Sequence, residues 1–130
     1  MERLRIASGS PWESRVGYSR AVRCGNIVAV SGTTGTDADG VVAGADGYTQ
    51  AKKALERIAA ALREAGAQPS DVVRTRVFVT DIGQWEAVGR AHAEMFGDVR
   101  PACTMVEVRR LIAEDILVEI EADAVIAKES

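Results

Sequence analysis

The stretch RPACTMVEVRRLIAEDILVEIEADA, residues Arg100–Ala124, decides the fold class of this chain. Two strand-like runs begin in it, Thr104–Val108 and Ile116–Ile126, with a short charged connection between them. In the second run, Ile and Val or Ala alternate with a second set of residues, Leu117, Glu119, Glu121 and Asp123. A period of two places the two sets on opposite sides of a strand. We therefore predict a closing strand with one apolar face and one acidic face.

The composition is that of one globular domain, which we expect to span residues 1–130. Hydrophobic residues make up 47% of the chain and charged residues 27%, a balance typical of folded domains. The net charge of −3 and the pI near 5.2 provide no basic surface. A nucleic-acid partner is therefore not expected.

The cysteines and the histidine do not form a metal-binding motif. Cys24 and Cys103 lie far apart, and His92 is the single histidine, so we expect neither a metal ion nor another cofactor. The N-terminus lacks the apolar stretch of a signal peptide, and no run approaches the length of a membrane span. These features favour a cytoplasmic protein with free thiols and no membrane partner.

The rest of the chain alternates between strand and helix patterns. Strands are predicted at Arg3–Ile6, where the run is short and Gly9-Ser10-Pro11 follows as a break, and at Gly17–Arg23, Asn26–Ser31 and Val72–Thr80. Helices are predicted at about Tyr48–Ala65 and Gln84–Phe96. Beyond the short opening strand the order is β-β-α-β-α-β-β, which favours an α+β domain: a mixed sheet with two helices on one face.

Apolar spacing and end signals support both helices. Asp46 or Thr49 can cap the start of the first helix, and Gly66 stands where a left-handed stop is usual. Residues spaced by three and four give the second helix one apolar stripe, made of Trp85, Val88, His92, Met95 and Phe96. We accordingly expect Trp85 and His92 to pack in the core of the domain.

Two candidate ligand-binding elements lie near the first long strands. We interpret the Gly-rich segment Ser31–Gly35 as a turn after a strand, in which backbone amides can converge on a carboxylate. The same residues are also compatible with a plain loop. The segment lacks the lysine and the spacing of a phosphate-binding loop. Tyr18 offers a phenol for a ligand, or it is an ordinary half-buried strand tyrosine.

Two candidate reactive groups lie in the closing strands. Glu119 stands between Val118 and Ile120, so partial burial would raise its pKa and suit it to proton transfer; the alternative is a solvated acidic face. Cys103 offers a thiol nucleophile if a base lies beside it, or it fills space. Trp12 could form an aromatic wall of a site together with Trp85.

Five segments together resemble the Rid family (reactive intermediate deaminase, or YjgF-like) over nearly the whole chain. They are VGYSRAV (Val16–Val22), CGNIVAVSGT (Cys24–Thr33), DVVRTRVFVTDIGQW (Asp71–Trp85), RPACTMVEV (Arg100–Val108) and LVEIEADA (Leu117–Ala124). The resemblance implies a chorismate-mutase-like α+β domain assembled as a homotrimer, in which three sheets form a barrel. It places small-molecule clefts between neighbouring subunits.

The resemblance also implies an activity, the hydrolysis of reactive enamines and imines to 2-oxo acids and ammonia. Tyr18, Ser31 and Gly32 match substrate-binding positions, and Glu119 would orient or activate the attacking water. In the deaminases an arginine after the Pro-Ala pair grips the substrate carboxylate, and Cys103 occupies that position here. Gly89 stands where the second helix commonly carries an asparagine.

The Cys103 departure leaves two functions open. A thiol cannot provide the paired donors of a guanidinium, so the expected substrate is a reactive metabolite other than the usual 2-imino acids. Three arginines, Arg76, Arg100 and Arg109, are candidates for the missing role. The alternative function is a trimer that senses or sequesters a small molecule without catalysis. Ribonuclease action is disfavoured by the absence of a basic stripe.

Overall fold

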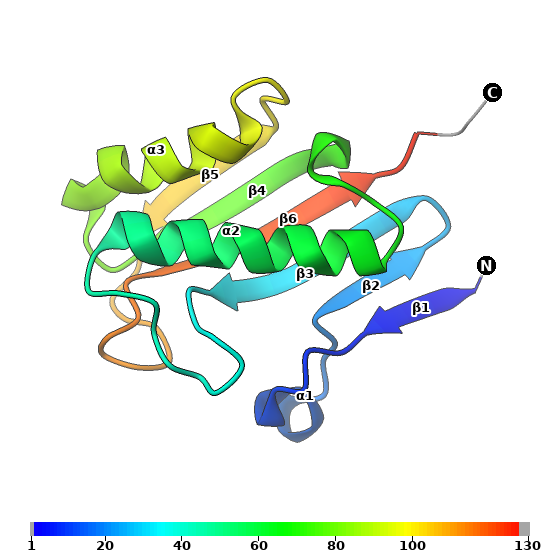
Figure 1. Cartoon of the computed structure of the whole chain (residues 1–130), viewed down its shortest axis with the longest axis horizontal. Coiled ribbons are helices and arrows are strands. Elements are labelled where there is room, and N and C mark those ends of the chain that lie inside the picture. The colour runs from blue at the N-terminus through cyan, green and yellow to red at the C-terminus, as the bar shows by residue number, and fades with distance from the viewer. Residues whose placement is uncertain (1, 128–130) are drawn as a thin grey trace.

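The computed structural model describes residues 2–127 and contains one six-stranded mixed sheet with helices packed on it (Figure 1). The strands run in the order β1-β2-β3-β6-β4-β5, and only the β4–β5 pair is parallel among those described. Their bounds are β1 Arg3–Ile6, β2 Ala21–Cys24, β3 Ile27–Thr34, β4 Val72–Val79, β5 Ala102–Glu107 and β6 Val118–Val125. The helices are α1 Pro11–Val16, α2 Gly47–Glu64 and α3 Trp85–Phe96, with short 3-10 turns at Pro69–Asp71 and Ile82–Gln84. The predicted α+β class is confirmed.

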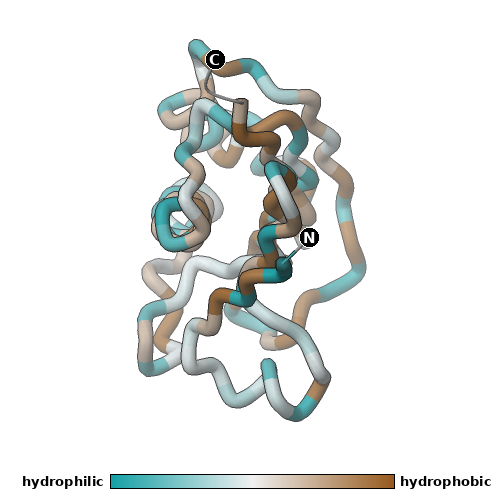
Figure 2. Tube along the Cα trace, turned by 90° about the vertical axis from the view of Figure 1, so that its right-hand side faces the viewer, coloured by the Kyte–Doolittle hydropathy of each residue, from teal (hydrophilic) through white to brown (hydrophobic). Residues whose placement is uncertain are grey.

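The two long helices, α2 and α3, lie side by side over one face of the sheet (Figure 1). The view from the side shows α2 end-on beside the strands (Figure 2). The core fills the space between these layers and includes Leu55, Ile58 and Leu62 of α2 and Val77 of β4, each at most 1% exposed. No helix among residues 2–127 combines the length and apolar character needed to cross a membrane.

The alternation predicted for the closing strand is confirmed, although β6 is shorter than Ile116–Ile126. Its apolar residues are at most 2% exposed and belong to the core under the helices: Val118, Ile120, Ala122 and Ala124. Ile116, just before the strand, is also buried. The acidic set is half-buried on the other face. The apolar side is therefore covered within the chain, so the face available for contact with other subunits is the one that carries Glu119.

Both ends of α2 agree with the sequence signals. The Asp46 carboxylate caps the start by accepting a hydrogen bond from the Thr49 amide (2.9 Å), and Gly66 follows the end with a φ of 86°. Buried Gln50 then ties the helix to two loops: its Nε2 donates to the carbonyl oxygens of Gly44 and Asp115, and its Oε1 accepts from the Leu117 amide, each at 2.8 Å.

The segment before β2 differs from the prediction. Pro11–Val16 forms a helix, because the Ser10 side chain caps the Trp12 amide (3.3 Å) and Pro11 has the φ that a first turn needs. Gly17 ends this helix in the left-handed conformation (φ 89°). Tyr18 therefore lies in the connection between α1 and β2, and not in the extended run that we predicted at Gly17–Arg23.

Two further predictions are corrected by the structure. Trp85 begins α3 on the outer side and is 56% exposed, so it does not pack in the core. Trp12 is also largely exposed. The first closing strand covers Ala102–Glu107, two residues earlier than the predicted start at Thr104, because its pairing with β4 already begins at Arg74 and Ala102.

Candidate functional site

The segment Ser31–Thr34 continues β3 and is not the turn that we predicted. Its pairing with β6 shifts between Val30 and Thr33, so Ser31 and Gly32 together face the single residue Glu121. This is a β-bulge, a feature that redirects side chains and is frequent beside active sites. The Ser31 hydroxyl donates to the carbonyl oxygen of Ser19 (2.7 Å), which fixes the bulge to the segment before β2.

Glu119 lies directly against this bulge. A Cβ atom added to Gly32 would come within 2.5 Å of Oε2 of Glu119, so the side chain packs where any other residue would carry its own. Burial raises the pKa of the Glu119 carboxyl, and the negative charge of Glu121 adds to this effect, while the positive charge of Arg20 opposes it. A half-buried carboxyl with a raised pKa is suited to accept and return a proton.

Arg20 is a site residue that the sequence analysis missed. It is 7% exposed, and its Nη1 donates to the carbonyl oxygen of Gly32 (2.7 Å) and to Oγ1 of Thr33 (2.9 Å). Its guanidinium carbon lies 5.7 Å from the centre of the Tyr18 ring. The sequence shows only an arginine at the edge of an apolar run, which usually indicates a solvated charge; its burial follows from the bulge.

Four of the predicted site residues thus lie around one bulge, namely Tyr18, Ser31, Gly32 and Glu119. A hollow of about 420 Å³ adjoins two of them on the uncovered face of the sheet. Tyr18 and Ser31 line it, together with acidic groups of β6 and arginines of β1. The chain therefore builds a recess with a phenol, a hydroxyl and the carboxylates of Glu121 and Asp123, on the face of the sheet that also carries Glu119.

Cys103 lies apart from this group within one chain. It sits on the edge strand β5 opposite Thr75 of β4, and paired residues of parallel strands point to the same side. Thr75 is buried on the helix side, whereas Glu119 projects from the other face, with β4 between β6 and β5. Cys103 itself is exposed and forms no disulfide among the described residues.

His92 is a packed residue, as predicted. Its Nε2 lies 2.8 Å from Oγ1 of Thr75, and its ring lies 4.8 Å from that of Phe96. Burial lowers the pKa of this imidazole. Across residues 2–127, His, Cys, Asp and Glu side chains do not gather in groups of three or more that would hold a metal ion.

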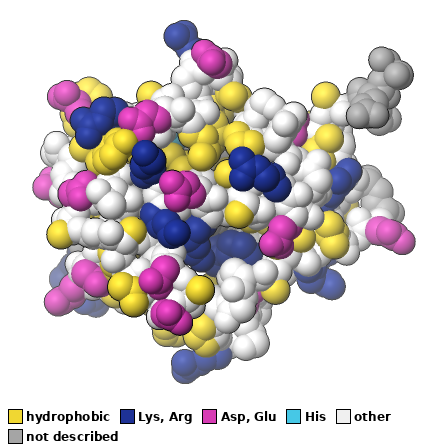
Figure 3. Space-filling model, in the orientation of Figure 1, with side chains coloured by type: hydrophobic (Ala, Val, Ile, Leu, Met, Phe, Trp, Pro, Cys, Tyr) yellow, Lys and Arg dark blue, Asp and Glu magenta, His cyan; other side chains and the backbone are white. Residues whose placement is uncertain are grey.

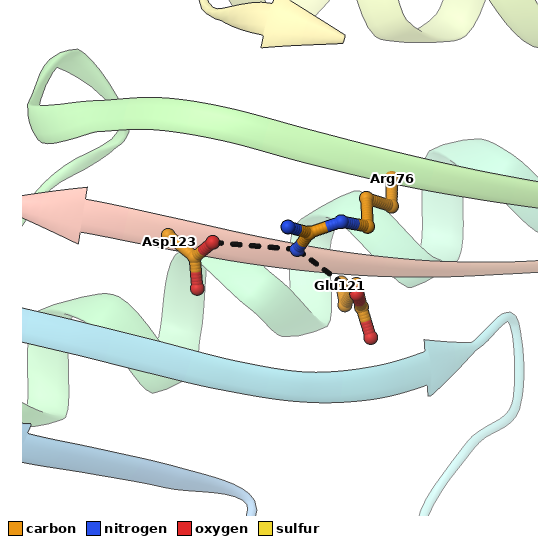
Figure 4. Close-up of polar contacts among 3 residues, drawn as sticks. All are labelled: Arg76, Glu121 and Asp123. Atoms are coloured by element: carbon orange, nitrogen blue, oxygen red, sulfur yellow. Dashed lines mark hydrogen bonds and ion pairs between the residues drawn. The ribbon is translucent and has the colours of Figure 1, made fainter. Parts of the chain in front are cut away.

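The arginines considered as replacements for the missing one have other contacts. Arg76 reaches Glu121 (3.2 Å) and Asp123 (3.4 Å) from β4 (Figure 4), so these acids are paired and not simply solvated. The Nε of Arg100 donates to the carbonyl oxygen of Gly97 (3.2 Å) in a turn after α3. Arg109 is exposed in the loop after β5.

Comparisons with known proteins agree with this fold. Residues 9–126 match the family model described as Endoribonuclease L-PSP. The crystal structure of Rv2704 from Mycobacterium tuberculosis, a member of the YjgF/YER057c/UK114 family, is similar with a TM-score of 0.89 and 54% identity, over 96% of this chain and 100% of that one.

Two relatives have names that refer to small molecules. The 2-iminobutanoate/2-iminopropanoate deaminase of Salmonella typhimurium is 34% identical over 111 residues, which cover 83% of this chain and 86% of that protein. The crystal structure of Escherichia coli TdcF with bound serine has a TM-score of 0.79 and 28% identity, over 95% of this chain and 94% of the other.

The sheet, the two long helices on one face and the bulge beside Glu119 define a chorismate-mutase-like α+β protein. Because residues 9–126 match the family model and these relatives cover most of the chain, the chain belongs to the Rid/YjgF/YER057c/UK114 family. The predicted family is thereby confirmed.

Proposed function

We propose that this chain hydrolyses a small reactive imine or a related carbonyl-type metabolite, with Glu119 as the group that activates water. The main support for this proposal is the half-buried Glu119 carboxyl, which has a raised pKa and packs against Gly32 of the bulge. The activity named for the Salmonella typhimurium relative and the serine bound to TdcF support a small-molecule site of this kind.

The proposed reaction adds water across the C=N bond. Glu119 takes a proton from the water as the water oxygen attacks the carbon of the protonated imine, which gives a neutral carbinolamine. The protonated carboxyl then gives this proton to the nitrogen, and ammonia leaves as the C=O bond forms and the hydroxyl proton passes back to Glu119, which releases it to the ammonia as ammonium. Tyr18 and the backbone of Ser31 and Gly32 would hold the substrate. A carboxyl whose pKa is raised toward the working pH transfers the proton in both directions efficiently.

The proposed cleft is completed by a neighbouring subunit of a homotrimer. The face that carries Glu119 is uncovered in one chain, while Cys103 lies on the edge strand β5. We propose that the β5 edge of one subunit reaches the bulge of the next and brings Cys103 to the site. Cys103 then occupies the position of the carboxylate-binding arginine of the deaminases, so the substrate differs from the usual 2-imino acids.

Ammonia release tests the catalytic proposal. Imines generated in place by an amino-acid oxidase are added to the protein, and semicarbazide traps what survives. Glu119→Gln should abolish hydrolysis, because the amide cannot accept the proton, while Glu56→Gln on the exposed side of α2 should not change it. Binding of imine products without hydrolysis of any imine tested would instead establish a sensing or sequestering protein.

Cys103→Arg tests the proposed role of position 103. Wild-type protein should hydrolyse 2-iminopropionate slowly. The variant should hydrolyse it faster by on the order of ten- to a hundredfold, because a charge-assisted hydrogen bond to the substrate carboxylate contributes about that much. Val41→Arg adds the same charge in an exposed loop and serves as the control. Fast hydrolysis by the wild type, or no gain in a correctly assembled variant, would contradict this role.

A further inference from the structure

Two arginines lie next to each other along one edge of β3. Strand β2 pairs with β3 only as far as Ala21 and Val30, with one further backbone bond from the Ser31 amide to the Arg20 carbonyl oxygen (2.9 Å), so among residues 2–127 no strand pairs with the later residues of β3 on that side. Nη1 of Arg20 donates to the carbonyl oxygen of Gly32 (2.7 Å), and Nη1 of Arg57, from α2, donates to that of Thr34 (2.8 Å). Carbonyls two residues apart in a strand are separated by about 6.5–7 Å, so the guanidinium groups are near neighbours.

Hydroxyl groups fix both guanidiniums in place. Arg20 Nη1 also donates to Oγ1 of Thr33 (2.9 Å), and Arg57 Nη1 donates to Oγ1 of Thr36 (2.9 Å). In each arginine the hydrogen bonds within residues 2–127 come from Nη1 alone. The other N–H groups of each guanidinium therefore have no partner among these residues. Each guanidinium is also held in a fixed orientation before a ligand binds.

Among residues 2–127 no carboxylate forms an ion pair with Arg20 or Arg57, and the charges of Glu119 and Glu13 act on them only from a greater distance. The ion pairs among residues 2–127 all involve Arg76, and the buried Nε of Arg20 has no hydrogen-bond partner. Burial and the charge of Arg20 both lower the pKa of Arg57, while Tyr18 and Glu13 oppose this effect. Glu13 itself accepts hydrogen bonds from Ser8. Unpaired guanidinium charge away from water is costly, and an anion would relieve it.

From this geometry we infer that Arg20 and Arg57 bind the carboxylate group of the substrate. Guanidinium forks match carboxylates with two parallel hydrogen bonds. Lys and Arg side chains also gather near the centre of the face that α2 covers (Figure 3), which would attract an anion to this side of the molecule.

The inference rests on the proposed function and makes its substrate more specific. Gly32 joins the two groups: Glu119 packs against its Cα, and Arg20 holds its carbonyl oxygen. Arg20 and Glu119 form no ion pair with each other among the described residues, so both remain available. A carboxylate held at Arg20 would lie on the same bulge as Glu119, within reach of a C=N group elsewhere in the same small molecule. The substrate class is therefore a short anionic imine other than the usual 2-imino acids, with its carboxylate bound at the β3 edge and not at position 103.

Binding of 2-oxobutyrate, used as a small and stable carboxylate probe, tests the inference by calorimetry or NMR titration. Arg57→Gln and Arg20→Gln should each weaken binding by on the order of tenfold or more. Arg63→Gln, an exposed arginine on the same helix, should bind like the wild type. Arg20→Lys should bind more weakly than the wild type, because an ammonium lacks the fork.

The outcomes separate this inference from the proposed function. Unchanged affinity in both glutamine variants, or no binding of 2-oxobutyrate to the wild type at millimolar concentration, would overturn the inference. If Arg20→Gln does not fold, Arg57→Gln decides alone, because Arg57 is only half-buried. Arginine-dependent binding in a protein that hydrolyses no imine would support the carboxylate site and reject the hydrolase.

Discussion

At the scale of single residues, Gly32 is the position where the fold and the proposed chemistry depend on each other most directly. The bulge leaves room for the Glu119 side chain only because Gly32 has none, so Gly32→Ala should displace the carboxylate. We expect loss of activity and a fall in unfolding free energy of about 1–3 kcal/mol, typical of overpacking. Thermal or urea unfolding together with ammonia release measures both effects.

Gly89 is the matched control for stability. Apart from its chain neighbours and the adjacent helix backbone, no atom of residues 2–127 lies within 4 Å of a Cβ added there, and the residue is inside α3, where alanine is favoured over glycine by about 0.5–1 kcal/mol. Gly89→Ala should therefore raise the unfolding free energy. Equal responses of the two variants would show that the contact between Gly32 and Glu119 does not restrict position 32.

His92 gives the protein a pH-dependent stability. Burial lowers the pKa of the folded imidazole below its ordinary 6.5, so the unfolded chain takes up the proton first as the pH falls. The stability contributed by His92 is therefore complete above pH 6.5 and is lost as the pH falls from there through the folded pKa. The raised pKa of Glu119 acts in the opposite sense, weakening the fold as pH rises.

A comparison of variants isolates the effect of His92. The midpoint of unfolding should fall less between pH 7 and pH 5 in His92→Gln than in the wild type, because glutamine can still bond Thr75 and does not titrate. Because His92 is the only histidine, its single imidazole NMR signal reports the folded pKa directly. A signal that titrates at or above pH 6.5 would contradict the burial argument.

At the scale of elements, the sequence patterns predicted those features of the strands and helices that depend on residues close together in the chain. The periods of β6 and α2 can be read from the chain because each element buries one face, and the Asp46 cap lies within one turn of its partner. Helix α1 also had a local signal, Ser10-Pro11 followed by Gly17, which we interpreted as a break. The bulge and the burial of Arg20 had no local signal in the sequence, because both depend on β6 lying opposite β3.

Gln50 shows how one element holds others in place. Gln50→Leu would leave the carbonyl oxygens of Gly44 and Asp115 and the amide of Leu117 without their present partner. Buried unpaired groups each cost about 1–3 kcal/mol, so with partial hydration of the loops we expect a loss of about 2–4 kcal/mol. Glu56→Leu, on the exposed side of α2, should change stability little in the same denaturant titration. A small effect of Gln50→Leu would mean that the loops relax to water.

At the scale of the whole molecule, the uncovered face of the sheet is the feature that favours assembly into an oligomer. Besides the acids and arginines it exposes Ile27, Val106 and Val125, which are 56%, 41% and 41% exposed. These side chains lie on the side opposite the helices, because their neighbours along each strand are buried in the core or face it. Apolar groups spread over an open sheet face favour burial against another subunit.

We predict that light scattering will give a mass near three times 13.8 kDa. A charge in the contact should dissociate the trimer, so Val106→Glu should lower the mass toward that of one chain, while Ile112→Glu, in an exposed loop, should leave it unchanged. Dissociation should also abolish any hydrolysis, because the proposed cleft needs β5 of a second subunit. A wild-type protein that stays monomeric at micromolar concentration would remove both the trimer and the shared cleft, and a monomer that still hydrolyses imines would restrict the chemistry to the bulge of one chain.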